Sequence, residues 1–192
     1  NVVIYRWPRD MSVAHPPSHC FACNTPIKPY DNVPVFAYLW LRGKCRKCGA
    51  RFSPRYALIE LMFGLVAVAI AERLFAGASG AVLPAWAAAV HWVVRFSVAF
   101  GLMVTAFIDL DEMLVPDFLA AFAVAPLAAA ALLPAAAPTP GIIGAVAGAV
   151  LGPLVLWILF IGGYKKLTGK AGMGQGDAVI LLVICALLGL PG

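Results

Sequence analysis

Long apolar stretches alternate with short polar segments along the chain after residue 56. A helix needs roughly 17–25 predominantly apolar residues to cross a bilayer. Because lipid offers the backbone no hydrogen-bonding partners, such stretches cross as helices. Four of them are long enough: Ala57 to Phe75, Val82 to Ile108, Phe118 to Ala137 and Gly141 to Tyr164. A fifth, from Ala178 to Leu190, is incomplete. The pattern predicts an all-α polytopic membrane protein, built as a transmembrane helix bundle.

Composition agrees with this pattern. The 192 residues are 62% hydrophobic and 12% charged, whereas soluble domains are roughly 45–50% apolar and about 25% charged. An ordinary water-soluble globule is excluded, and so is a disordered chain, which would be rich in charge. The sequence starts in a polar segment at Asn1 and stops in an apolar stretch at Gly192. We therefore expect a fragment whose membrane domain is truncated at the C-terminus.

Basic residues are concentrated in the first third of the chain: residues 1–60 contain nine of the 14 Lys and Arg but three of the nine acids. Positive charge in short loops marks the cytoplasmic side of a membrane. The basic segments outside the predicted helices are residues 1–56 and 164–170, and an even number of spans separates them. Asp109 ends the second span and Asp177 precedes the last apolar stretch. This parity places both aspartates on the cytoplasmic face.

Four cysteines form two Cys-x-x-Cys pairs, Cys20 with Cys23 and Cys45 with Cys48, which 21 residues separate. Such pairs are typical of a tetrahedral Zn²⁺ site. Two disulfides or a redox dithiol are alternatives, but a cytosolic location argues against disulfides and a redox motif does not explain the second pair. Few apolar residues surround the cysteines, so metal binding would supply much of the folding energy. Residues 1–56 are thus predicted to form a small cytoplasmic zinc-binding module, and 57–192 the membrane domain.

The same module carries a cluster of basic side chains close to its junction with the membrane domain. Attraction to anionic lipid headgroups explains a basic cluster beside a membrane. Binding to nucleic acid is the alternative, and it is less economical at this position. We therefore expect membrane lipid as a partner, and no nucleic acid. The cluster consists of Arg42, Lys44, Arg46, Lys47, Arg51 and Arg55.

Two acidic segments lie at the ends of predicted spans. FIDLDEMLVPD contains Asp109, Asp111, Glu112 and Asp117, and GMGQGD ends at Asp177. Two carboxylates held close together in a poorly solvated site share a proton, so one can activate water while the other donates a proton. Peptide hydrolysis needs this chemistry. Helix capping by an aspartate and ion binding are alternatives. A nucleotide-binding glycine loop is not indicated, because no strand precedes the glycines.

Together these strings resemble the type IV prepilin peptidases, a bacterial family of GxGD-type aspartic membrane proteases. The likeness covers nearly the whole chain in order: NVVIYRWPR, HCFACNTPIKPYDNVPVF, LRGKCRKCGARFSPRYALIE, FIDLDEMLVPD and GMGQGD. It implies that Asp109 and Asp177 are the catalytic pair. The supporting positions of the active-site loops would then be Gly174, Gly176, Asp111 and Asp117.

The resemblance also implies a bifunctional enzyme of the bacterial inner membrane. It would cleave the leader from type IV prepilins or secretion pseudopilins at the cytoplasmic membrane boundary, and then methylate the new N-terminal residue with S-adenosyl-L-methionine. The cysteine module is associated with this methyl transfer, and Glu60 is a candidate for binding the methyl donor. The sequence departs from the family pattern at Ala57, Gly172 and Val179, while both aspartates are intact.

A non-catalytic membrane scaffold is the alternative function, in which the zinc module docks pilus or secretion assembly factors. Such a scaffold would tolerate replacement of both aspartates, but not the loss of Cys20 or Cys45. An ion transporter is a third class. It would need ionisable residues near the middle of the bilayer, which the sequence offers at His91 and Arg95.

Overall fold

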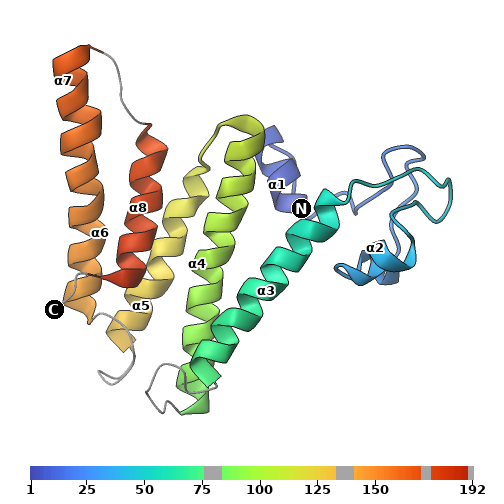
Figure 1. The fold of residues 1–192 in the computed structure, drawn as a ribbon, viewed down its shortest axis with the longest axis horizontal. Helices are drawn as coiled ribbons and strands as arrows, with labels where there is room; N and C mark the ends of the chain where they lie inside the picture. Colours follow the sequence, from blue (N-terminus) through green and yellow to red (C-terminus); the bar gives the residue numbers. More distant parts are fainter. Residues whose placement is uncertain (76–83, 133–140, 170–173, 190–192) are drawn as a thin grey trace. The chain divides into compact units, whose positions relative to one another are not determined.

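The computed structural model describes residues 1–75, 84–132, 141–169 and 174–189, and most of these are helical (Figure 1). Within those ranges there is no β-sheet; extended segments meet at two isolated bridges, His19 with Pro26 and Lys44 with Arg51. The chain divides into two compact units, Asn1–Val68 and Ala69–Gly192. The prediction of a helical protein is confirmed.

The first unit consists of short helices and turns that lead into one long helix. α1 (Val2–Arg6) continues directly into the 3₁₀ turn η1 (Trp7–Arg9). A second 3₁₀ turn, η2 (Pro29–Asn32), precedes α2 (Phe36–Trp40). Both 3₁₀ turns have a proline in their first two positions, where its fixed φ and missing N–H are tolerated. α3 (Arg55–Phe75) begins in this unit.

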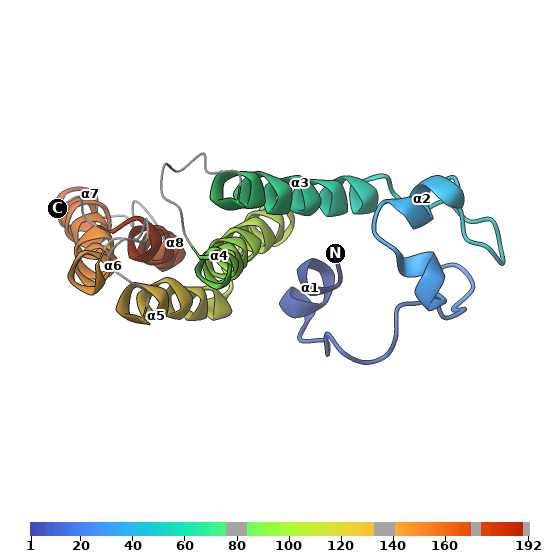
Figure 2. The ribbon, with the colours of Figure 1, turned by 90° about the horizontal axis from the view of Figure 1, so that it is seen from below.

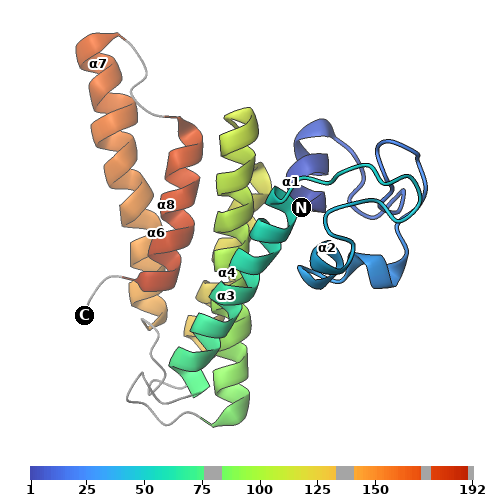
Figure 3. The ribbon, with the colours of Figure 1, turned by 45° about the vertical axis from the view of Figure 1, so that its right-hand side comes forward.

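The second unit is a set of helices around α8, which lies between α6 on one side and α4 and α5 on the other (Figures 1 and 2). α6, η4 and α7 follow one another as one rod (Figure 3). The elements are α4 (Ala85–Glu112), η3 (Asp117–Ala123), α5 (Val124–Leu132), α6 (Ile142–Leu156), η4 (Trp157–Gly163), α7 (Tyr164–Thr168) and α8 (Gln175–Leu188).

Small residues allow these helices to pack closely. A Cβ atom on Gly148 of α6 would lie 2.4 Å from the backbone oxygen of Cys185 in α8, and one on Gly101 of α4 would lie 2.8 Å from the ring of Phe122. Such distances leave no room for a side chain. Close helix approach at small residues is the usual packing in lipid, and the structure confirms it for the glycine-rich α6. The buried core beside these contacts consists of Val98, Leu119, Ala123, Val183 and Ala186.

Two described helices are long and apolar enough to cross a membrane, Ala85–Glu112 and Ile142–Leu159. Two more are apolar but shorter, Asp117–Ala129 and Gly176–Leu188. α3 is 21 residues long; it carries Glu60, Glu72 and Arg73, and these charges dilute its apolar character. The ends of the predicted second and third spans fall partly outside the described residues. The full set of predicted crossings therefore stays a prediction.

Candidate active site and metal centre

The four predicted zinc ligands lie on two loops with the same backbone hydrogen bonding. In the first loop the N–H of Cys20 donates to the oxygen of Thr25 at 2.9 Å, and the N–H of Asn24 donates to that of Cys20 at 2.8 Å. The second loop repeats this pattern: Cys45 donates to Ala50 at 2.8 Å, and Gly49 donates to Cys45 at 2.9 Å. Asn24 and Gly49 have positive φ values of 52° and 72°, a conformation that Asn and Gly adopt at low cost. Each Cys-x-x-Cys motif thus turns both of its sulfurs to one side.

The structure brings all four sulfurs together. The Sγ atoms of Cys20 and Cys48 are 3.8 Å apart, and those of Cys23 and Cys45 are 4.0 Å apart. All four lie within 4.8 Å of one another. A disulfide would require about 2.05 Å, so these cysteines are reduced. Tetrahedral Zn²⁺ with Zn–S bonds of about 2.3 Å places its sulfurs about 3.8 Å apart. The cluster is therefore compatible with zinc in its chemistry and spacing.

Local hydrogen bonds favour the thiolate forms of Cys23 and Cys45. In Cys48 a backbone hydrogen bond from Ala50 lowers the pKa, but desolvation and the neighbouring thiols outweigh it and raise the pKa to about 11. The hydroxyl of Thr25 and then its backbone N–H lower the pKa of Cys23 to about 6. The backbone N–H groups of Cys48 and Lys47 lower the pKa of Cys45. Since the thiolate is the ligand form of cysteine, part of the cluster is ionised at neutral pH before any metal arrives.

The residues around the cysteines lack an apolar core. In residues 1–56, all of which the structure describes, the buried hydrophobic side chains are those of Ile4 and Cys20. Phe21, Phe36 and Trp40 are instead largely exposed. A segment with so little burial gains stability from a metal that links its loops. This agrees with the expectation that zinc would supply folding energy.

The first predicted aspartate lies on a helix and not in a loop. α4 continues through Asp109, Asp111 and Glu112, and ends at Met113, whose φ is +53° and whose N–H donates to the oxygen of Asp109 at 2.9 Å. The loop is thus shorter than the sequence suggested. Pro116 requires α4 to end before it, because the residue before a proline is pushed out of the helical conformation. The carboxyl group of Asp109 lies on the exposed last turn of α4.

The second predicted aspartate stabilises the start of α8. The N-cap residue is Gly174, and the Oδ2 atom of Asp177 accepts a hydrogen bond from its N–H at 3.1 Å. Asp177 therefore caps the helix from the third helical position and not as the N-cap itself, and its negative charge also suits the helix dipole. It is half-buried. Asp117, by contrast, starts η3 with no side-chain capping bond.

The C-terminal end of α4 and the N-terminal end of α8 lie at the same end of the second unit (Figures 1 and 3), and Asp109 and Asp177 belong to these helix ends. The loop after α4 touches the glycine segment before α8, because a Cβ atom on Gly176 would lie 2.5 Å from the Cβ of Val115. Only a glycine permits this approach. The structure thus brings together the two acidic segments, which are distant in the sequence. Gly172, one of the departures from the family pattern, is outside the described residues.

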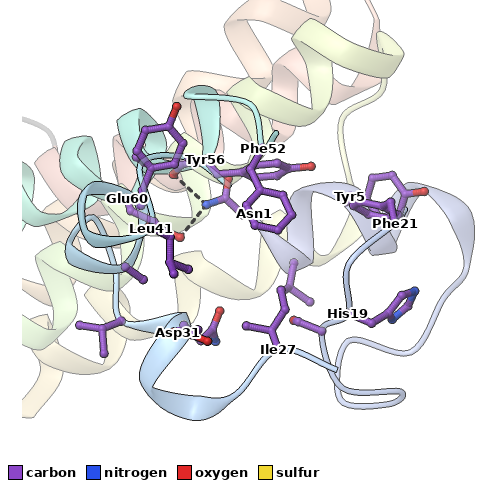
Figure 4. Close-up of a pocket in the computed structure, with 18 of the residues that line it drawn as sticks. Asn1, Tyr5, His19, Phe21, Ile27, Asp31, Leu41, Phe52, Tyr56 and Glu60 are labelled. Carbon is purple, nitrogen blue, oxygen red and sulfur yellow. Dashed lines mark hydrogen bonds between the residues drawn. The ribbon is translucent and has the colours of Figure 1, made fainter. Parts of the chain in front are cut away.

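Glu60 lies apart from these aspartates in the chain, on the second turn of α3. Its Oε1 atom accepts a hydrogen bond from the side-chain amide of Asn1 at 3.0 Å, and its Oε2 atom accepts one from the N–H of Val35 at 2.9 Å. It lines a pocket of the first unit, whose aromatic walls include Tyr5 and Phe52 (Figure 4). No motif in the sequence indicated these aromatic walls. The available signal was that residues 1–56 contain several aromatic residues but too few other apolar residues to form a core around them.

Two family models match this chain. The Bacterial Peptidase A24 N-terminal domain matches residues 1–74, and the Type IV leader peptidase family matches residues 96–192, half of the chain. This chain belongs to the type IV leader peptidase family. Asp109 and Asp177 both fall in the segment that matches the leader peptidase model, while the cysteines and Glu60 fall in the segment that matches the N-terminal domain.

Several relatives of this chain carry the name prepilin leader peptidase/N-methyltransferase. The protein from Aeromonas hydrophila is 40% identical over 190 residues, which are 95% of this chain and 60% of the relative. That from Neisseria gonorrhoeae is 35% identical over 192 residues, 95% of this chain and 58% of the relative. That from Pseudomonas putida is 34% identical over 226 residues, all of this chain and 67% of the relative. The chain thus spans about 60% of the Aeromonas protein. No solved structure matches it.

Proposed function

We propose that this protein is a bifunctional prepilin peptidase and N-methyltransferase. The observation that carries the proposal is the contact of Gly176 with Val115, which brings the two acidic segments of a leader peptidase family member to one place. The names of the relatives support both activities. The substrates are type IV prepilins or secretion pseudopilins, whose leader is removed.

Asp109 and Asp177 form the catalytic pair of the peptidase. One carboxylate takes a proton from a water molecule, and the oxygen of that water attacks the scissile carbonyl carbon. The other carboxyl group donates a proton to the departing amide nitrogen as the C–N bond breaks, so the products are a leader carboxylate and a free amine. Asp111, Asp117, Gly174 and Gly176 support this site from the same two segments.

Methyl transfer follows on the amine that cleavage releases. S-adenosyl-L-methionine supplies an electrophilic methyl group on a positively charged sulfur. The neutral amine attacks this carbon, a C–N bond forms, and the electron pair of the broken C–S bond returns to sulfur. The nitrogen then loses a proton to solvent. Residues 1–56 form the module associated with this step, with a structural Zn²⁺ on Cys20, Cys23, Cys45 and Cys48.

Residues 57–192 form the peptidase domain, a polytopic helix bundle of the bacterial inner membrane. The two long apolar helices support a membrane location, and the basic segments support a cytoplasmic location for the zinc module and both aspartates. A prepilin leader is then cut where it leaves the membrane. Anionic lipid attracts the basic cluster of the module.

A mass measurement tests both activities together. The purified membrane protein is incubated with a prepilin, with and without S-adenosyl-L-methionine, and the product is weighed. We expect the mass of the leader to be lost in both samples, and the mass of one methyl group to be gained only with the donor. An intact prepilin in both samples would contradict the proposal. Cleavage without methylation would contradict its second half.

The Gly176→Ala substitution tests the contact between the acidic segments. The new Cβ atom would meet Val115 at 2.5 Å, so the start of α8 and the loop after α4 must move apart. Because small displacements of catalytic groups are costly, we expect leader cleavage to slow by about 10-fold or more. Gly64→Ala is the control, since no atom lies within 4 Å of the added methyl group. Equal cleavage by both variants would show that the contact is unimportant.

A further inference from the structure

A pocket of about 340 Å³ lies within the first unit, between α1, the cysteine loops, α2 and the start of α3 (Figure 4). This is large enough for a small organic ligand, since such sites measure about 300–1,000 Å³. Its walls are mainly apolar and aromatic, with a few polar groups among them. That mixture is typical of a site for a small organic ligand or cofactor.

The two acidic side chains that line the pocket, Asp31 and Glu60, differ in their partners. Asp31 accepts two hydrogen bonds from the guanidinium group of Arg46, at 2.6 and 2.8 Å. Glu60 instead accepts hydrogen bonds from two uncharged groups, and it interacts electrostatically with the N-terminal ammonium group of Asn1. Glu60 is therefore the pocket carboxylate that no guanidinium group of the described residues holds, and it already lies where it attracts a cationic group.

Aromatic rings complete this environment. Tyr5, Phe21, Phe52 and Tyr56 line the pocket, and Figure 4 shows Phe52 and Tyr56 beside Asn1 and Glu60. An aromatic face attracts a cation, most strongly where water is excluded, and it also stacks against a flat heterocycle. A ligand with a purine and a cationic centre can stack its purine on the aromatic rings and pair its cation with the carboxylate of Glu60.

We propose that this pocket holds the methyl donor S-adenosyl-L-methionine, with the Glu60 carboxylate facing one of its cationic groups. The inference rests on the proposed methyl transfer and gives it a location. The relevant cation is the sulfonium or the α-ammonium, which the experiment below distinguishes. The cysteines themselves are not among the lining residues, whereas their neighbours His19, Phe21 and Gly43 are. The zinc loops thus form part of the wall of the donor site.

Two substitutions test the site by different physical means. Ala57→Phe fills the pocket without changing its charge, because Ala57 lines it. Glu60→Gln removes the charge and keeps the size of the side chain. Leu58→Phe is the matched control: it adds a ring at the neighbouring residue of α3, which is 57% exposed and does not line the pocket. The full chain is used throughout, in detergent or nanodiscs.

Equilibrium dialysis measures the binding of labelled S-adenosylmethionine and of the uncharged thioether S-adenosylhomocysteine, and leader cleavage is followed in the same samples. We expect Ala57→Phe to weaken binding of both ligands by roughly tenfold or more, and Leu58→Phe to bind like the parent. Glu60→Gln should also weaken donor binding by roughly tenfold. If Glu60→Gln weakens the binding of S-adenosylmethionine alone, Glu60 faces the sulfonium. If Glu60→Gln weakens the binding of both ligands equally, Glu60 faces the α-ammonium, which both ligands carry. All variants should still cleave the leader.

Parent-like donor binding by Ala57→Phe would overturn the pocket as the donor site, even if the protein methylates its product. If Glu60→Gln also loses leader cleavage, its fold has changed and Ala57→Phe alone decides. A parent protein that binds no donor and adds no methyl group would instead contradict the proposed methyl transfer itself. The two failures are therefore distinguishable.

Discussion

Replacing Asp109 with Asn is expected to slow leader removal by about 10²–10⁴-fold, the range that one general acid or base contributes. Asn keeps the size of the side chain but cannot accept or donate the proton. Asp177→Asn should have the same effect. It should not unfold α8, because an amide oxygen can still accept the hydrogen bond from the N–H of Gly174. The loss would therefore be chemical and not structural.

The double variant sharpens this prediction. Groups that act as one catalytic unit are strongly non-additive, so Asp109→Asn combined with Asp177→Asn should cleave no more slowly than either single variant. Glu72→Gln is the control, since this exposed acid on α3 lies in neither acidic segment. Leader cleavage is measured by gel or mass on protein of normal membrane abundance. Full cleavage by either single variant would remove the peptidase assignment and favour the scaffold.

Loss of one cluster cysteine is expected to empty the zinc site and loosen the first unit. The purified parent should contain about one zinc ion per chain, and Cys23→Ser should contain much less, because a serine hydroxyl replaces a thiolate. With only Ile4 and Cys20 buried among the hydrophobic residues of 1–56, the unit has little else to hold its loops. Limited proteolysis should then cut it faster.

Cys185→Ser is the matched control for this measurement, because Cys185 lies in α8 and outside the cluster. It should keep its zinc and its protease resistance. Elemental analysis and a strong chelator complete the experiment: chelation of the parent should reproduce the proteolysis pattern of Cys23→Ser. A parent that contains no zinc after purification without chelators would contradict the metal site. Unchanged proteolysis after chelation would contradict its structural role.

Periodic and local patterns predicted much of this protein. The apolar stretches predicted α4 to within a few residues and predicted α6 and η4 as one helical segment, because burying an apolar backbone in lipid leaves the helix as the available structure. The cysteine spacing predicted the cluster, because each Cys-x-x-Cys turn presents both sulfurs on one side. Element ends were less predictable. The sequence placed Asp109 at the edge of a loop, whereas α4 continues to Glu112, since acidic residues do not stop a helix and only Pro116 forces the break.

The amino-acid sequence by itself determined the helical class, the cysteine ligand set and the two acidic segments, because each depends on residues that are close along the chain. The tertiary structure alone decided which distant groups meet. Two examples are the contact of Gly176 with Val115 and the hydrogen bond between Asn1 and Glu60, which both line the pocket. Each depends on the path of the chain between the two partners. Packing sets that path, and no local spacing encodes it.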